Sequence, residues 1–527
     1  MSTHSKTSNP DVEGVRDARS IDEDELQLQL HRTWNIVESF AASFCALNFI
    51  GGVRTGLFLG LLAGGPAAIW SSYIVTIFFM MITAFILAEI CSALPLSGSI
   101  YIWAAESAGP KYARFVGFIV AFWSSTAWMT FAAGNCQTTA NYILSQLSVW
   151  EVDFPGGVTS DNIKFRALTW ACAEIILIIA IAINYLPPRL YSMIFRVSMG
   201  LMLVDFLLVV IWLPIGVSNT YGFRSAKDVF TMTYNGTGAP AGWNWILSFL
   251  FTAGCMTGFD ASGHIAEETK NARVVAGKGI ISSALATGLC GFVLTILLLF
   301  CTPDLDVLFS LNAPQPFVQL YAMALGKKGS AFMTALAAFG LILNTSVAVV
   351  AASRLVFAVA RDGILPGSKW VGAVDSQGQP KNAVTVIYIF GAIVLCTILP
   401  SEVAFYSLIS AGGVPTIAAY GLIALLRLTM TPDAFKGSYF YLKGFRKPFY
   451  AVAVVWNGLI VCVMLSPFFF PVTAEVFNFA CVIFGTSTIL GITAWYFTPE
   501  DKWLSREQVL EIFETANAVD SNSSVSS

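Results

Sequence analysis

The sequence predicts an all-α polytopic membrane protein with about twelve transmembrane helices. Of its 527 residues, 56% are hydrophobic and only 12% are charged, whereas soluble domains carry about 25% charged residues. About 20 apolar residues are needed to cross roughly 30 Å of hydrocarbon. Twelve windows of this kind occur, at residues 36–63, 66–94, 115–147, 167–186, 192–217, 245–263, 276–302, 331–360, 383–400, 403–427, 449–470 and 476–497.

Polar tails flank this membrane domain of residues 34–497. Residues 1–33 and 498–527 are expected to be cytoplasmic tails and to be mostly disordered. Ser20, three residues before Glu23, could instead begin a short helix. The first residues are polar, so no cleavable signal peptide is visible and the first apolar helix is expected to direct insertion.

The distribution of Lys and Arg predicts the orientation. With the N-terminus inside, the cytoplasmic connections and helix ends hold sixteen of these residues and the outer connections hold six, as the positive-inside rule requires. The sequon Asn235-Gly236-Thr237 then falls in an outer loop. Asn235 is therefore a candidate glycosylation site.

Two spans are interrupted by glycine and carry a charge at the interruption. The first reads "NFIGGVRTGLFLGLLAGG", with Gly51 and Gly52 beside Arg54, and the sixth reads "FTAGCMTGFDASGHIAEE", with Gly258 beside Asp260. A carboxylate at membrane depth costs about 2.5–3.5 kcal/mol on insertion scales, so it marks a functional site. Discontinuous helices five spans apart are typical of an inverted-repeat transporter, whose substrate site forms where they unwind.

Close helix packing is the alternative explanation for these glycines, because small residues favour it in membranes. Two matched interruptions, each with a buried charge, favour a substrate site over packing alone. Further along the sixth span, Glu267 and Glu268 are expected at the cytoplasmic surface in solvated ion pairs with Lys270 and Arg273.

Three segments in order carry a family resemblance: "AEICSALPLSGSIYIWAAESAGPKYARFVGF" (88–118), "TGFDASGHIAEETKNA" (257–272) and "SRLVFAVARDGILP" (353–366). The chain resembles the amino acid–polyamine–organocation superfamily over residues 33–497. More narrowly, it resembles the fungal amino-acid/choline branch, which includes GABA, choline and thiamine permeases. The resemblance implies the leucine-transporter-type fold, with ten helices in two inverted five-helix repeats and two further helices, and uptake driven by a proton gradient.

The substrate site is expected at the two breaks and on the third span, at Ile50, Gly51, Gly52, Val53, Arg54, Asn135, Gly258, Phe259, Asp260 and Ala261. Many superfamily members hold the substrate carboxylate on the amides of a G-S-G-type break in helix 1, and the corresponding segment here is "IGGV". The freed N–H groups there would attract a carboxylate. Arg54 could add a bidentate contact. Alternatively, Arg54 forms a structural ion pair with an acid such as Asp260 or reaches the outer interface.

Two carboxylates are candidates for proton coupling, Asp260 and Asp205. Asp260 could pair with a substrate amine or carry the proton, and could also cap the second half of helix six. Phe259 could gate the site or contact a cation through its ring. Simple packing of Phe259 is equally compatible with the sequence.

The expected function is secondary active transport: proton-coupled uptake of an amino acid or a related amine such as GABA across the plasma membrane. The alternatives are a permease for an organic cation (choline, a polyamine or thiamine), a nutrient-sensing transceptor, and a location in the vacuolar or another internal membrane. An enzyme, a metal site and a cofactor are not indicated, because the chain has three His and no C-x-x-C pair. A net charge of −3 gives no reason to expect a nucleic-acid partner.

Overall fold

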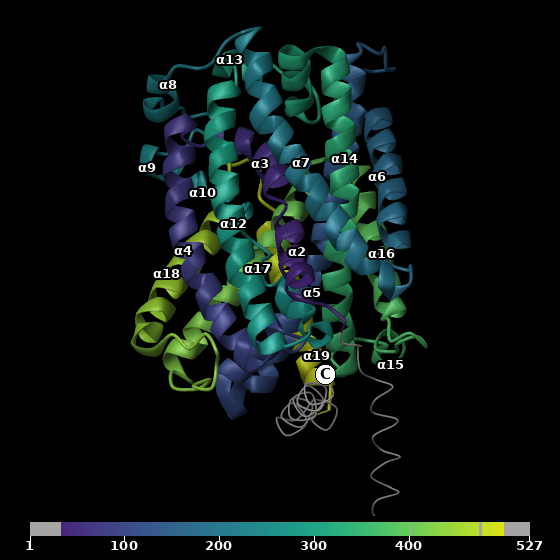
Figure 1. Ribbon diagram of the computed structural model, residues 1–527, viewed down its shortest axis with the longest axis vertical. Coiled ribbons are helices and arrows are strands. Elements are labelled where there is room, and N and C mark those ends of the chain that lie inside the picture. Colours follow the sequence, from purple (N-terminus) through teal and green to yellow (C-terminus); the bar gives the residue numbers. More distant parts are fainter. Residues whose placement is uncertain (1–32, 401, 474–476, 500–527) are drawn as a thin grey trace, which may run out of the picture.

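The computed structural model describes residues 33–400, 402–473 and 477–499, and in this part its regular structure is helical apart from two isolated β-bridges (Figure 1). Most of the long helices run roughly along one axis of the molecule. Eleven spans are long and apolar enough to cross a membrane. The sixth predicted span is broken into short helices and completes the twelve crossings. The predicted all-α polytopic fold is confirmed.

The long helices are α2 (Ile36–Leu47), α3 (Phe49–Leu62), α4 (Gly65–Ala93), α5 (Ile100–Val149), α6 (Ile163–Ile183), α7 (Tyr191–Ser218), α12 (Ala272–Cys301), α14 (Pro316–Arg361), α16 (Lys381–Leu395), α17 (Glu402–Thr429), α18 (Arg446–Leu465) and α19 (Ala480–Phe497). The broken sixth span consists of α9 (Ala241–Leu247), α10 (Phe249–Gly254) and α11 (Ala261–His264). Short helices α8 (Ala226–Thr231), α13 (Leu305–Phe309) and α15 (Ser368–Val371) lie in the connections.

The first span breaks at Asn48, and the prediction of a break at Gly51–Gly52 is wrong by one turn. Asn48 has a left-handed backbone with φ of 39°, and its Oδ1 accepts a hydrogen bond from the N–H of Gly51 at 3.3 Å. Asn tolerates this conformation and caps the following turn. The two glycines lie in the first turn of α3. A Cβ on Gly52 would lie 3.3 Å from Cys255 Sγ, so this glycine permits close approach to the sixth span.

The sixth span unwinds at the predicted place. Between α10 and α11, residues 255–260 leave the helix, and Gly258 has φ of +118°, a conformation that side chains rarely adopt. Asp260 occupies the cap position of α11, but its side chain makes no capping hydrogen bond. Its carboxylate is therefore available for other partners.

A second matched pair of irregularities supports two five-helix repeats. The third span, α5, bends at Gly109 with φ 71° and ψ 168°, and the eighth, α14, bends at Gly326 with φ 75° and ψ 169°. These spans are again five apart. Helices with equivalent places in two repeats thus share both the break and the bend.

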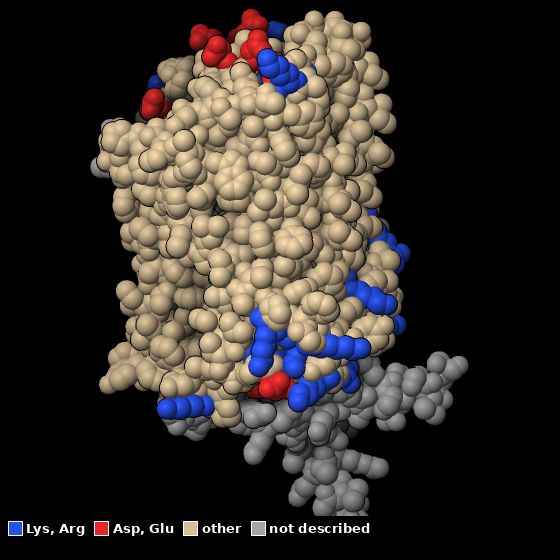
Figure 2. Space-filling model, turned by 90° about the vertical axis from the view of Figure 1, so that its left-hand side faces the viewer, with Lys and Arg blue, Asp and Glu red and all other residues tan. Residues whose placement is uncertain are grey.

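Charge is segregated along the long axis of the molecule. In Figure 2, Lys and Arg gather near one end, and Asp and Glu gather at the opposite end. The end rich in Lys and Arg is the end where Figure 1 shows α15.

Candidate functional site

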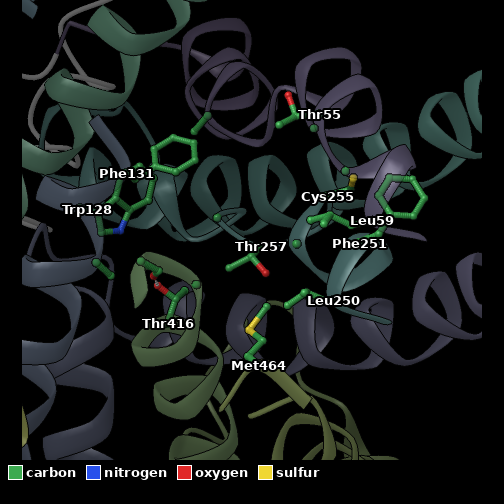
Figure 3. Close-up of a pocket in the computed structure, with 18 residues that line it drawn as sticks. Thr55, Leu59, Trp128, Phe131, Leu250, Phe251, Cys255, Thr257, Thr416 and Met464 are labelled. Carbon is green, nitrogen blue, oxygen red and sulfur yellow. Dashed lines mark hydrogen bonds between the residues drawn. The ribbon is translucent and has the colours of Figure 1, made fainter. Parts of the chain in front are cut away.

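A cavity of about 260 Å³ lies where both broken spans meet three other helices (Figure 3). Its walls come from the first span, α5, the sixth span, α17 and α18. The lining residues are Ala46, Gly52, Thr55, Gly56, Leu59, Ala127, Trp128, Phe131, Leu250, Phe251, Gly254, Cys255, Thr257, Gly258, Gly412, Gly413, Thr416 and Met464.

Aromatic rings and hydroxyl groups define the chemistry of this cavity. Trp128 and Phe131 lie together on one side, Phe251 lies opposite, and Thr257 lies between them (Figure 3). None of these lining side chains is charged. Such a surface suits a flat, largely apolar ligand with a few groups that can hydrogen-bond.

The nearest carboxylate lies behind the cavity wall. Asp260 is 1% exposed and does not line the cavity. Trp128, which does line it, donates from Nε1 to Asp260 Oδ2 at 3.4 Å, and the Tyr420 hydroxyl donates to Oδ1. His264 Nε2 lies 3.0 Å from Oδ2. The Trp128 indole would therefore lie between a cation in the cavity and the Asp260 carboxylate.

Hydroxyl groups join the inner halves of the two broken spans. The Ser43 hydroxyl on α2 donates to the Phe259 carbonyl at 2.7 Å and accepts from the Ser262 N–H at 2.8 Å. The Ser262 hydroxyl donates to the Ser39 carbonyl at 2.6 Å. These contacts tie α2 to α11.

The outer half of the first span is held by a buried ion pair. Arg54 Nη2 lies 2.5 Å from Asp205 Oδ1 on α7, and the Arg54 side chain is 1% exposed. The suggested pairing of Arg54 with Asp260 is therefore wrong. Arg54 and Asp205 line a separate small cavity of about 10 Å³ with Tyr142 and Asn344. Neither side chain lines the large cavity. The two charges neutralise each other at the small cavity instead.

The residues predicted for the site divide into two groups. Gly52 and Gly258 line the large cavity, as expected for the two interruptions. The others do not line it in this structure: Ile50, Gly51, Val53, Arg54, Asn135, Phe259, Asp260 and Ala261. Phe259 stacks on Tyr420, with ring centroids 5.1 Å apart. The helical rotation of α3 and the turn after Gly258 aim the side chains of the two broken spans into the protein, whereas Asn135 lies on α5.

Sequence reasoning missed most of the lining side chains. Trp128 and Phe131 are three residues apart in the uncharged stretch 115–147 of α5, so they share a face. That spacing is compatible with a pair of aromatic side chains that faces a ligand, although it also fits ordinary packing. Thr257 directly precedes the unwound Gly258, whereas Thr416 carries no local signal.

A network of buried ion pairs lies between the site and the end of the molecule rich in Lys and Arg. Arg354 Nε donates to Glu268 Oε1 at 2.7 Å, and its Nη2 donates to Gln379 Oε1 at 2.7 Å. The Trp34 ring lies 5.5 Å from the Arg354 guanidinium, and the Trp34 N–H donates to the Glu268 carbonyl. Glu268 is 2% exposed, so its predicted place in a solvated surface pair is wrong. Below, these residues are called the inner network.

A second ion pair lies beside the inner network. Arg361 Nη1 lies 3.1 Å from Glu267 Oε2. Burial raises the pKa of the neighbouring Asp362 carboxyl, and the Arg361 charge opposes that rise. Glu267 is thus also paired with a residue of α14, instead of with Lys270 or Arg273.

The sequon lies in the connection between α8 and α9. Asn235 is exposed, while its amide donates to the Ala239 carbonyl at 2.8 Å. Thr237 is 1% exposed and donates to Asn244 Oδ1 at 2.7 Å. Glycosylation of Asn235 stays a prediction.

Comparisons with known proteins agree with this architecture. The thiamine transporter thi9 of Schizosaccharomyces pombe is 46% identical over 94% of this chain and 90% of its own. The amino-acid permease BAT1 of Arabidopsis thaliana is 27% identical over 89% of this chain and 92% of its own. A manganese transporter of Eremococcus coleocola superposes with a TM-score of 0.56 over 88% of this chain and 94% of that one. At 11% identity this likeness concerns the fold alone.

The family assignment rests on nearly the whole membrane domain. A family model described as amino acid permease matches residues 35–487, which include both broken spans and the inner network apart from Trp34. The same range contains every residue that lines the large cavity. This chain therefore belongs to the amino acid permease family, within the amino acid–polyamine–organocation superfamily whose resemblance its motifs carry.

Proposed function

We propose that this protein imports an aromatic organic cation of the thiamine type. The observation that carries the proposal is the 46% identity with a thiamine transporter along 94% of the chain. Thiamine joins an aromatic pyrimidine to a cationic thiazolium ring and a hydroxyethyl group. This chemistry matches a cavity with aromatic walls, hydroxyl groups and a carboxylate one layer away.

Different side chains of the cavity wall would recognise different parts of the ligand. Trp128 and Phe131 would stack on a flat ring, and the electron-rich ring faces would attract a cation. The hydroxyl groups of Thr55, Thr257 and Thr416 would hydrogen-bond its polar substituents. The Asp260 carboxylate, held behind Trp128, adds a negative potential at the same wall.

We further propose that uptake is coupled to protons and occurs at the plasma membrane with both termini in the cytoplasm. The segregation of Lys and Arg toward one end supports this orientation. The chain has no G-x-x-x-x-G-K-[ST] motif for ATP. Buried carboxylates near the site offer places for a proton.

Competitive uptake tests the substrate. Labelled thiamine uptake would be measured in a yeast lacking its own thiamine permeases, with unlabelled thiamine, choline, GABA and other amino acids as competitors. We expect transport of thiamine that GABA does not inhibit, and collapse of that transport with a protonophore but not on removal of sodium. Uptake of GABA without uptake of thiamine would contradict the proposal.

An amino acid is the second candidate substrate. Relatives such as BAT1 are named amino-acid permeases and align over most of this chain. Against this candidate, Arg54 is already paired and no basic side chain lines the large cavity to hold a carboxylate. The same competition panel distinguishes the two.

A further inference from the structure

His264 is a fully buried histidine to which the substrate cavity assigns no role. It lies on α11, is 0% exposed, and does not line the cavity. Its Nε2 lies 3.0 Å from Asp260 Oδ2, and its Nδ1 lies 2.6 Å from the Ser99 hydroxyl. The imidazole and Trp128 rings are nearly perpendicular, at 87°, with ring centroids 5.2 Å apart. His264 thus connects the carboxylate behind the cavity with the segment that precedes α5.

The pair of Asp260 and His264 is neutral only when it holds one proton. With a neutral imidazole, the Asp260 carboxylate would be a buried charge balanced only by hydrogen bonds, which come from Tyr420, Trp128 and the Nε2–H of His264. Such a charge is costly in a sealed, low-dielectric site. With one proton on His264 the two side chains form an ion pair. A proton that leaves this pair requires a path to water.

Ser99 provides the first step of such a path. A protonated imidazole donates from Nδ1 to the Ser99 oxygen, whereas a neutral imidazole can accept at Nδ1 from the Ser99 hydroxyl. In the relay the Nδ1–H bond breaks, that proton joins the Ser99 oxygen, and Ser99 passes its original proton onward to water. No other atom changes its bonding, so one proton moves and the charge balances.

The same segment leads to the end of the molecule rich in Lys and Arg. Two residues before Ser99, the N–H of Ser97 donates to Glu267 Oε1 at 2.9 Å. Glu267 is paired with Arg361, and these two side chains are 14% and 17% exposed. The polar contacts that start at Asp260 and pass through His264 thus reach Ser99, which lies two residues along the chain from the residue that contacts these partly exposed groups.

We propose that His264 carries the co-transported proton together with Asp260 and releases it through Ser99 toward the cytoplasmic end. The proposal rests on the proton coupling proposed above. Trp128 separates this pair from the cargo, so the proton site and the cargo site lie on opposite sides of the same indole.

The titratable and charged groups around the pair come from four elements. The Tyr420 hydroxyl of α17 faces Asp260 directly. The remaining groups lie toward the cytoplasmic end, on the sixth span, α5 and α14: Glu267, Glu268, Tyr101, Arg354, Arg361 and Asp362. The three acids of this second set are each paired with an arginine there, so His264 is the partner left to balance Asp260.

Three variants test the proposal. His264→Gln keeps an amide that can reach Asp260 and Ser99 but cannot carry a proton at neutral pH. Ser99→Ala removes the relay hydroxyl. Ser107→Ala is the matched control, because it removes a buried hydroxyl without a hydrogen-bond partner from the first turns of α5, the helix that begins after Ser99. Each variant would be assayed for pH-driven accumulation of labelled thiamine, and for thiamine exchange at equal pH on both sides, with surface expression measured.

In His264→Gln we expect pH-driven accumulation to fall by about tenfold or more, while exchange stays within about threefold of the wild type, because exchange needs no proton release. Ser99→Ala should show the same split in milder form, and Ser107→Ala should match the wild type. Wild-type accumulation in both test variants would overturn the role of His264, as would an equal loss of exchange and accumulation. If His264→Gln does not reach the membrane, Ser99→Ala alone decides between these outcomes.

The wild type separates the two proposals. If wild-type accumulation survives a protonophore, the proposed proton coupling is wrong, and the role of His264 falls with it. If wild-type accumulation collapses and the variants behave as the wild type, only the role of His264 is wrong.

Discussion

Glu268→Gln should weaken the closed end of the protein that is rich in Lys and Arg. Glu268 and Arg354 are 2% and 1% exposed and 2.7 Å apart. Removing one partner of a buried pair costs about 3–5 kcal/mol, because the other charge stays buried without compensation. If the inner network separates when the site opens toward that end, this cost falls on the closed state alone. The closed-to-open ratio should then fall by roughly 10²- to 4 × 10³-fold.

Hydrogen exchange measures this shift in purified protein. The N–H groups of Thr33 and Trp34 donate to the Glu268 carbonyl at 2.9 and 3.0 Å, and α2 follows directly. Amide protection of residues 33–47 reports the fraction of time for which this region is open. In Glu268→Gln these amides should exchange faster, while those of α7 should keep their wild-type rates.

Two further variants make the result specific. Glu151→Gln removes the same charge from an ion pair with Lys327 that is largely exposed, and it should change nothing. Adding Arg354→Met to Glu268→Gln should restore part of the protection, because the unpaired charge is gone. Unchanged exchange in a well-folded Glu268→Gln protein would refute the inner network as a closing device.

Four further outcomes are expected. Asp260→Asn should reduce uptake by about tenfold or more, equivalent to about 1.4 kcal/mol, at normal surface expression; wild-type uptake would reduce this carboxylate to a structural role. Arg54→Met should lower the thermal unfolding temperature in detergent, because it leaves Asp205 buried and unpaired, and adding Asp205→Leu should recover part of the loss. Trp128→Ala should raise the KM for thiamine more than Trp128→Phe does, since stacking needs a ring; equal values would argue against stacking. A tag in residues 218–242 should be accessible on intact cells, and surface labelling of either terminus would contradict the proposed topology.

Much of the fold follows from local features of the sequence. Apolar windows of the right length place the crossings, since bilayer thickness fixes their length. Gly258 identifies the break in the sixth span because its backbone conformation needs glycine. The break in the first span was displaced because Asn48 can also take a left-handed conformation, and its side chain caps the next turn. The positions of the glycines alone therefore do not reveal the break at Asn48.

The site was harder to predict than the fold. Which face of a helix meets the cavity depends on its rotation against four or five neighbours, and those contacts come from distant segments. Asp260 was recognised as a buried charge, but its place behind Trp128 depends on the packing of α5 and α17. Likewise, Arg54 could be expected to need an acid, but no local pattern connects it to Asp205, 151 residues away.

The break at Asn48 divides the first span into two halves. Below, α3 is called the wall and α2 the lever. Outside the break, α3 is fixed to α7 by the ion pair of Arg54 and Asp205. On the other side of the break, α2 is joined to α11 by the hydroxyl groups of Ser43 and Ser262, so we expect these two half-helices to move together if the span bends at Asn48. The wall supplies four of the first-span residues that line the large cavity, Gly52, Thr55, Gly56 and Leu59, and the lever supplies Ala46. On this view, substitutions in α3 should alter substrate selectivity, and substitutions in α2 should alter the transport rate. Each property could then change in evolution without the other.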